Sequence, residues 1–228
     1  MKKQEFFHDY LIAKEREPGA LKREFFYEGT TLTERSLEHY KEVLRLPVED
    51  WKGKLVLDIG SSADERFSKQ AAQKGIKVIS LNPELKESEI RNLSKASIWD
   101  SLRWKKKQRK SAAGIAQELP FKDNSFDAEV SVFGIPAYLP PYESEYHTTF
   151  KEIIRTLKHG SSAYFYPILE GLYHSPSFAR ILQEFSEVAV FDFEEAEMDV
   201  AARAWSGYRG ERRVFRLTIT KKSFEDKN

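Results

Sequence analysis

The most constraining feature of the sequence is a strand, a helix and a second strand within about thirty residues. Residues 54–60 form an apolar run that ends in the letters DIG, and such a run is typical of a strand buried on both faces. Residues 63–74 follow with helical spacing, Gly75 is a helix-ending signal, and residues 77–81 form a second apolar run. This pattern predicts a βαβ unit with parallel strands and a right-handed crossover.

Further apolar runs and helical patterns follow along the chain. They predict strands at 112–116, 126–133, 162–168, 187–193 and 212–220, and helices at 143–157 and 176–185. Residues 1–50 are helical and amphipathic in pattern. Their second helix has an apolar face of Leu37, Tyr40, Val43 and Leu44, and its candidate cap is Thr31 or Thr33. No internal repeat or low-complexity linker appears. We therefore predict an N-terminal helical extension or lid at 1–50 and one domain at 51–228.

Composition excludes several classes of function. The chain has 37 Lys and Arg against 36 Asp and Glu, so no chain-wide field indicates nucleic acid or a membrane. The absence of Cys excludes disulfides, thiolate metal sites and a Cys nucleophile, and it favours a reducing compartment, so we predict a cytoplasmic protein. The five His lack metal-ligand spacing, so no metal site is expected. No apolar run approaches ~18 residues, and the N-terminus lacks the pattern of a secretory signal.

Three stretches between about residues 50 and 170 carry a family resemblance. They read VLDIGSSAD at 56–64, AQELPFKDNSFD at 116–127 and EIIRTLKHG at 152–160. In these stretches the chain resembles the class I S-adenosylmethionine-dependent methyltransferases, closest to the C-methyltransferases of ubiquinone and menaquinone biosynthesis. The resemblance implies an α/β, doubly wound, Rossmann-like sheet of seven strands, mostly parallel, with the last strand antiparallel.

The resemblance also implies a site for S-adenosylmethionine. Asp58 and Gly60 shape the turn after the first strand, and backbone amides near Ser61 meet the carboxylate of the cofactor. Asn82 bonds the ribose, the amide of Ala116 bonds the adenine, and the wall of the methyl-transfer chamber includes Phe133. The full set of cofactor-binding residues that we expect is Asp58, Gly60, Ser61, Ser62, Asn82, Ala116, Gln117 and Phe133.

Four positions depart from the family pattern. Ser62 and Asp64 stand where the family has its second and third glycines, Asn82 replaces the acid that holds ribose, and Ile115 replaces the acid that meets adenine. These departures leave open a second hypothesis, in which the fold has lost catalysis and serves as a binding or regulatory module. The turn also lacks the G-x-G-x-x-G pattern, which disfavours a dinucleotide.

Candidate catalytic side chains lie after the strand at 126–133. Methyl transfer requires positioning and sometimes a base, and Tyr138, Tyr142 and His147 are placed to face a substrate. The alternative is that the tyrosines pack on the next helix and that His147 is a solvated helix residue. The letters LPPY at 139–142 resemble the motif of adenine-N6 methyltransferases, but the position and the missing amide indicate a coincidence.

A basic segment raises the question of the partner. Residues 99–110 combine two Trp with a run of cations, among them Lys105, Lys106, Lys107 and Arg109, which suits phosphate contact and base stacking. A solvated charged loop is the alternative. We expect a small-molecule substrate, with nucleic acid as the alternative through these residues. Tyr10, Tyr27 and Arg35 are candidates for a lid over the cofactor.

Overall fold

The computed structural model describes residues 35–61, 65–81, 110–112, 114–136, 139, 142–198 and 213–223. Its helices are α3 (Leu37–Leu44), α4 (Arg66–Gln73), α7 (Glu143–Thr156), α8 (Glu170–Tyr173) and α9 (Pro176–Glu184), with a 3-10 turn at Val48–Trp51. Its strands are β1 (Leu55–Ile59), β2 (Lys77–Leu81), β3 (Lys110–Ala112), β4 (Phe126–Val132), β5 (Leu157–Leu169), β6 (Ala189–Ala196) and β7 (Val214–Lys221).

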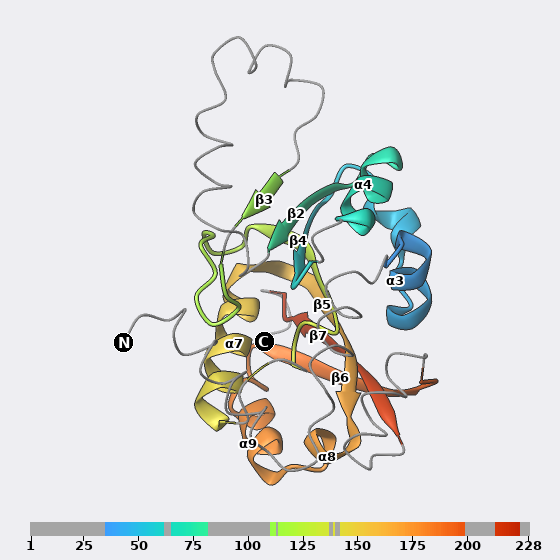
Figure 1. Cartoon of the computed structure of the whole chain (residues 1–228). Coiled ribbons are helices and arrows are strands. Elements are labelled where there is room, and N and C mark those ends of the chain that lie inside the picture. The colour runs from blue at the N-terminus through green and yellow to red at the C-terminus, as the bar shows by residue number, and fades with distance from the viewer. Residues whose placement is uncertain are drawn as a thin grey trace, which may run out of the picture.

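These strands form one sheet of seven in the order β3-β2-β1-β4-β5-β7-β6 (Figure 1). The first five are parallel, and β7 runs antiparallel to both of its neighbours, β5 and β6. This arrangement confirms the predicted fold class. The strand order reverses between β1 and β4, and open α/β sheets bind ligands at such a point, beyond the carboxyl ends of the strands.

The predicted βαβ unit is present with small shifts in its bounds. β1 pairs in parallel with β2 from Leu55 opposite Lys77 to Ile59 opposite Leu81, and α4 makes the crossover. Val56 and Leu57 are both fully buried, although they point to opposite faces of the sheet. The strand β1 is largely apolar because both of its faces are covered, as the sequence predicted.

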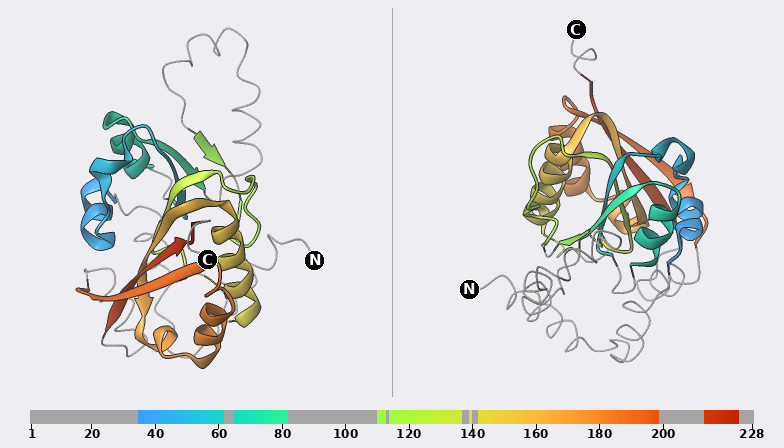
Figure 2. Two further views of the ribbon diagram at one scale, coloured as in Figure 1. Left: turned by 180° about the vertical axis from the view of Figure 1, so that it is seen from behind. Right: turned by 90° about the horizontal axis from the view of Figure 1, so that it is seen from above.

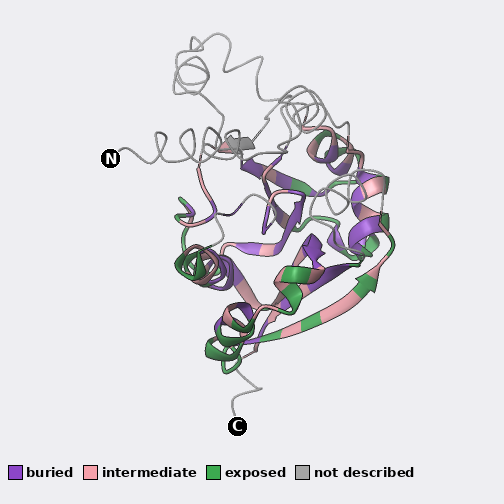
Figure 3. Cartoon of the chain, turned by 60° about the horizontal axis from the view of Figure 1, so that its bottom comes forward, coloured by how far each residue is buried: buried purple, intermediate pink, exposed green. Residues whose placement is uncertain are grey.

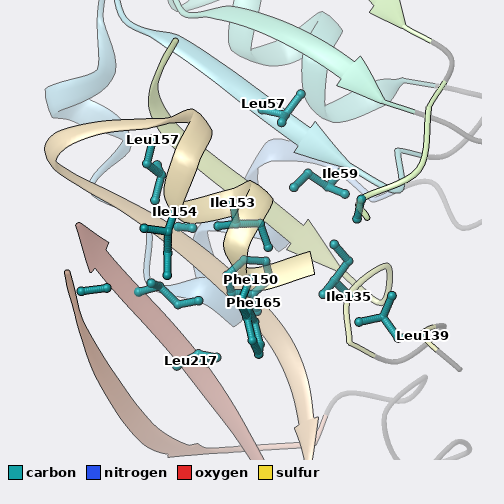
Figure 4. Close-up of a cluster of buried hydrophobic side chains, with 14 of the residues drawn as sticks. Leu57, Ile59, Ile135, Leu139, Phe150, Ile153, Ile154, Leu157, Phe165 and Leu217 are labelled. Atoms are coloured by element: carbon teal, nitrogen blue, oxygen red, sulfur yellow. The ribbon is translucent and has the colours of Figure 1, made fainter. Parts of the chain in front are cut away.

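Helices cover the two faces of the sheet in separate layers. Seen from above, α7 lies on one side of the sheet and α3 with α4 on the other (Figure 2). The layer with α7 and α9 contains the larger cluster of buried side chains, in which Phe150 and Ile153 of α7 pack against Phe165 of β5 (Figure 4). The layer with α3 and α4 contains a second cluster, built on β1, β4 and β5. At one edge of the sheet, β6 is largely exposed or half-buried, whereas the central strands are buried (Figure 3).

Helix α3 belongs to the segment that we predicted as an extension. Its predicted apolar face, Leu37, Tyr40, Val43 and Leu44, is buried in the same cluster as β1 and β4. The expected cap at Thr31 or Thr33 is wrong, because the Oγ atom of Ser36 accepts from the backbone N of His39 at 3.1 Å. The described end of the extension thus shares a hydrophobic core with the sheet.

The third strand is also displaced from its predicted position. We expected it at 112–116, but β3 covers Lys110–Ala112, and Ile115 instead pairs with Glu118 across a tight turn. Gly114 lies between the strand and the turn, and a Cβ atom there would meet the side chain of Leu81 at 3.0 Å. The backbone at Gly114 therefore packs closely against Leu81 of β2, just after β3 ends.

Candidate functional site

Asp58 lies near the carboxyl end of β1 and is almost completely buried. Its Oδ1 atom accepts a hydrogen bond from the hydroxyl of Tyr40 in α3 at 3.0 Å. Burial raises the pKa of the Asp58 carboxyl to about 7, although the hydrogen bond from Tyr40 and the charge of Arg35 act in the opposite direction. Asp58 is therefore a buried acid whose charge changes near neutral pH.

The chain leaves β1 through Gly60, which has a φ of +78°. A Cβ atom at Gly60 would also lie 3.0 Å from the Cα atom of Gly134, in the loop after β4. The amides of Gly60 and Ser61 both donate to the carbonyl of Leu81, at 2.9 and 3.2 Å. These two hydrogen bonds connect the turn to the end of β2. The amide of Ser61 was expected to bind the carboxylate of a cofactor, but here it bonds Leu81.

A cleft opens beside this turn. It is open to solvent and is lined by Arg35, Tyr40, Asp58, Gly60, Glu65, Arg66 and Phe67. The lining comes from α3 and the residue before its cap, from β1, and from the start of α4. Two carboxyl groups and two guanidinium groups share this cleft, so it presents both signs of charge to a ligand.

Arg35 was predicted as a lid candidate, and it is one of the cleft-lining residues. Its Nη1 atom donates to the carbonyl of Val132 at the end of β4. Its guanidinium lies over the ring of Phe133, 4.5 Å from the ring centroid. Arg35 therefore connects the segment before α3 to the carboxyl end of β4.

Phe133 occupies the position that the resemblance gave to the chamber wall. It is buried, has a φ of +59°, and its ring makes an edge contact with Tyr166 at 5.9 Å. Its backbone N donates to the carbonyl of Tyr166 at 2.7 Å. Phe133 does not line the cleft itself but supports Arg35, which does.

Other predicted cofactor residues lie elsewhere or outside the described residues. Ala116 is buried in the turn between Ile115 and Glu118, and the Nε2 atom of Gln117 donates to the Oε2 atom of Glu145 in α7 at 2.9 Å. Neither residue lines the cleft. The remaining predicted residues lie outside the described part of the chain, and they are Tyr10, Tyr27, Ser62, Asp64, Asn82, Lys105, Lys106, Lys107, Arg109 and Tyr138.

The two described candidates for catalysis lie on or next to α7. Tyr142 directly precedes the helix and is 58% exposed. The Nε2 atom of His147 lies 3.2 Å from a carboxylate oxygen of Glu184, and its ring packs 5.1 Å from that of Phe185. Neither Tyr142 nor His147 lines the cleft, and the contacts of His147 agree with the alternative of a surface helix residue.

Sequence reasoning missed four members of the cleft, which are Tyr40, Glu65, Arg66 and Phe67. Tyr40 appeared only as part of an apolar helix face, and nothing in the pattern showed that its hydroxyl reaches Asp58. Glu65 and Arg66 follow the altered glycine stretch, where the resemblance assigned no role.

Within the described ranges, no group of three or more His, Cys, Asp or Glu could hold a metal ion. No described helix has the length and apolar character needed to cross a membrane.

Comparisons with known proteins place this geometry in context. Residues 57–165 match the family described as a methyltransferase domain. A search of curated protein sequences finds no match. Among solved structures, PH0226 from Pyrococcus horikoshii OT3 is 15% identical, with a TM-score of 0.55 over 89% of this chain and 100% of that chain.

Two further structures share the fold. A putative S-adenosylmethionine-dependent methyltransferase from Methanococcus maripaludis is 16% identical, with a TM-score of 0.51 over 86% of this chain and 92% of that chain. A geranyl diphosphate methyltransferase in complex with geranyl diphosphate and sinefungin is 14% identical, with a TM-score of 0.51 over 81% of this chain and 76% of that chain. At such identities the likeness concerns the fold alone.

Proposed function

We propose that the chain, whose residues 57–165 match a methyltransferase domain, transfers a methyl group from S-adenosylmethionine to a small molecule. The observation that carries the proposal is the cleft at the carboxyl end of β1. There a buried carboxyl, Asp58, and the side-chain-free backbone of Gly60 lie beside the point where the strand order reverses.

The residues of the cleft suit the amino-acid end of the cofactor. That end carries one ammonium and one carboxylate, and the cleft presents the carboxyl of Asp58 together with the guanidinium of Arg35. Gly60 keeps a side chain out of the turn, because its positive φ and the nearby Cα atom of Gly134 both disfavour a Cβ atom. Opposite charges at fixed positions orient a zwitterion more strongly than either charge alone.

The chain needs to supply mainly position for this reaction. The cofactor, when bound, supplies a methyl group that is already activated by a sulfonium. Phe67 lines the cleft, and Phe133 and Tyr166 pack edge to face behind Arg35, so these rings support the side chains that position the ligand. Holding two reactants in line lowers the barrier without a nucleophile from the protein.

A small-molecule acceptor is the finer part of the proposal. It is supported by the shared fold of the geranyl diphosphate methyltransferase, whose complex contains a small substrate. The near-neutral charge of the whole chain also favours it over nucleic acid, because no overall field attracts a polyanion.

Isothermal titration calorimetry of the full chain tests the proposal. Titration with S-adenosylmethionine, and separately with S-adenosylhomocysteine, should give dissociation constants in the micromolar range. An absence of binding heat up to millimolar concentrations of either ligand would contradict the proposal. That outcome favours the degenerate binding module.

A further inference from the structure

We propose that the outer edge of β6 binds an extended, basic segment of a partner protein, which adds to the sheet as a further antiparallel strand. The proposal concerns a surface away from the cleft and does not depend on methyl transfer. β6 is the last strand in the order of the described sheet, so β7 covers one of its edges and no described strand covers the other. Figure 3 shows β6 at the outside of the sheet, exposed or half-buried along most of its length.

β6 lacks the features that usually protect the edge of a sheet. Its eight residues pair with β7 in one unbroken register, from Ala189 opposite Lys221 to Ala196 opposite Val214, without a bulge. Its sequence, AVFDFEEA, contains no Pro, Gly or Lys. The strand at the other edge, β3, is only three residues long. A long, regular edge strand is a template on which another strand can pair, and β6 meets that description.

The register shows which backbone groups of β6 point outward. The backbone N of Lys222 donates to the carbonyl of Val188 at 2.9 Å, so Val188 turns its polar groups toward β7. Hydrogen bonding alternates along an antiparallel pair, and the groups of Phe191, Phe193 and Glu195 therefore point away from β7. Within the described chain these three residues make no other backbone hydrogen bond. They offer donors and acceptors at the two-residue spacing that an added strand requires.

The side chains along this edge specify the chemistry of the partner. Val188 and Val190 are 38% and 54% exposed, which provides an apolar start. Asp192 is exposed and has no ion pair in the described part of the chain. The charge of Glu194 is already met by Arg45, and that of Glu195 only by a guanidinium 3.9 Å away. A partner strand with apolar residues opposite the valines and cations opposite the unmatched acids complements this edge.

A second copy of β6 is a poor occupant of the same edge. Three of the four residues at 192–195 are acids. Two copies paired in antiparallel fashion over their full length would place these acidic stretches side by side, and like charges on facing strands destabilise a sheet. A segment that carries Lys or Arg gains from the same acids. The charge of the edge therefore disfavours self-association and favours a basic partner.

The test uses a synthetic peptide as the probe. A blocked octapeptide, Thr-Lys-Thr-Val-Lys-Val-Val-Thr, places Lys opposite Asp192 and Glu195 and Val opposite Val190 when it pairs in antiparallel fashion. Hydrogen exchange of the full chain is followed by NMR with and without the peptide. The amides of Phe191, Phe193 and Glu195 should exchange fast in the free protein and slow by about tenfold near 90% occupancy. A counterpart peptide with Glu in place of Lys should give no such protection.

Glu195→Pro tests the pairing of backbones, and fluorescence anisotropy of the labelled basic peptide measures the affinity. Proline removes an outward N–H and leaves the bonds to β7 intact, so the affinity should fall at least about tenfold. Glu195→Gln is the matched control, because it removes the charge but keeps the amide, and it should cost less than about threefold. Position 195 is used because Phe191 and Phe193 pack on the core.

Asp192→Lys tests the charge without altering the backbone. It should weaken binding of the basic peptide and allow binding of the acidic one. Asp50→Lys, in the 3-10 turn before β1, changes the net charge equally and should leave both affinities unchanged. Thermal melting checks that each variant is folded, and Asp192→Lys carries the test if Glu195→Pro is not.

Several outcomes would overturn the proposal. One is that the basic peptide protects no outward amide of β6 at millimolar concentration, and another is that both peptides bind equally well. A third is that Glu195→Pro, when folded, binds like Glu195→Gln. If analytical ultracentrifugation instead finds a dimer that Asp192→Lys or Glu195→Pro dissociates, the edge binds a second copy and the basic partner is wrong.

Discussion

At the scale of the residue, Gly60 meets two constraints in one position. Its φ of +78° disfavours any residue with a Cβ atom, and a Cβ atom would also approach the Cα atom of Gly134 at 3.0 Å. Gly53 has nearly the same φ, +80°, but a Cβ atom there would meet nothing within 4 Å. A side chain at Gly53 would therefore meet only the cost of a positive φ, whereas a side chain at Gly60 would meet that cost and a close contact as well.

Gly60→Ala should destabilise the fold more than Gly53→Ala. In each variant we expect the positive φ to lower the free energy of unfolding by about 1–2 kcal/mol. In Gly60→Ala we expect a further loss, because the backbone near Gly134 must move. Urea denaturation monitored by circular dichroism measures both free energies of unfolding. Equal losses in the two variants would show that the contact with Gly134 is relaxed without cost.

Asp58 gives the site a pH dependence. Burial raises the pKa of this carboxyl to about 7, while Tyr40 and Arg35 favour its charged form and Glu65 opposes it. An ammonium on the ligand prefers the ionised carboxyl, so affinity for S-adenosylhomocysteine should increase as pH rises from about 6 to about 8. Asp58→Asn should remove this increase, measured by calorimetry across the range.

His159→Gln is the control for that experiment, because His159 bonds the carbonyl of Lys222 and does not line the cleft. Its pH profile should match that of the wild type. A wild-type affinity that stays constant across the range would show that Asp58 keeps one protonation state or does not face the ammonium.

At the scale of the element, α3 connects local helix chemistry to the site. Its four buried residues pack it on the sheet, Tyr40 reaches Asp58, and Arg35 lies just before its cap. The helix is only eight residues long, and a helix of this length is marginal without tertiary packing and caps. Its N-cap, Ser36, therefore contributes to the stability of the segment that holds Arg35.

Ser36→Ala should lower the free energy of unfolding by about 1 kcal/mol, because the hydrogen bond from the amide of His39 is lost. Ser175→Ala is the matched control, since Ser175 is the N-cap residue of α9 but makes no side-chain cap bond. Chemical denaturation of the two variants checks the difference. Equal changes in the free energy of unfolding of the two variants would show that the cap bond of Ser36 does not stabilise the helix.

At the scale of the whole molecule, the sheet carries a second buried acid on its central strand β4. Glu129 is fully buried, its Oε1 atom accepts from the hydroxyl of Thr156 at 2.6 Å, and its Oε2 atom has no hydrogen-bond partner. Burial raises its pKa to about 8, against the opposing effect of Lys221 and Arg155. The folded state thus binds a proton that the unfolded state has released above its ordinary pKa.

Stability should therefore fall as pH rises toward about 8, where the folded state loses this proton. The decline can reach about 1.4 kcal/mol per pH unit for one group. Glu129→Gln should flatten the decline most clearly between about pH 7 and 8, because below about 7 the buried Asp58 adds to the same decline, and above about 8 the folded state has lost the Glu129 proton as well. Urea denaturation at several pH values measures the slope.

The control is Glu187→Gln, at an exposed carboxyl, which should keep the wild-type slope. An unchanged slope in Glu129→Gln would indicate that the carboxyl is already ionised at neutral pH in the folded state.

Much of the fold could be predicted from the sequence, because it depends on local patterns. The apolar run before Gly60, the helical spacing after it and the run at 77–81 specify a βαβ unit whatever surrounds them. The less accurate prediction concerned β3, an edge strand of three residues, where packing of Gly114 against Leu81 decided more than propensity did.

The sequence by itself determined the sheet, its helical layers, and the acid and glycine that end β1. Only the tertiary structure decided that Tyr40 reaches Asp58 and that Arg35 lies over Phe133, 98 positions further along the chain. Periodicity reports which face of an element is buried, but it carries no information about which distant side chain that face meets. The cleft therefore emerges from packing between α3, α4 and β1, and no single stretch of the sequence contains it.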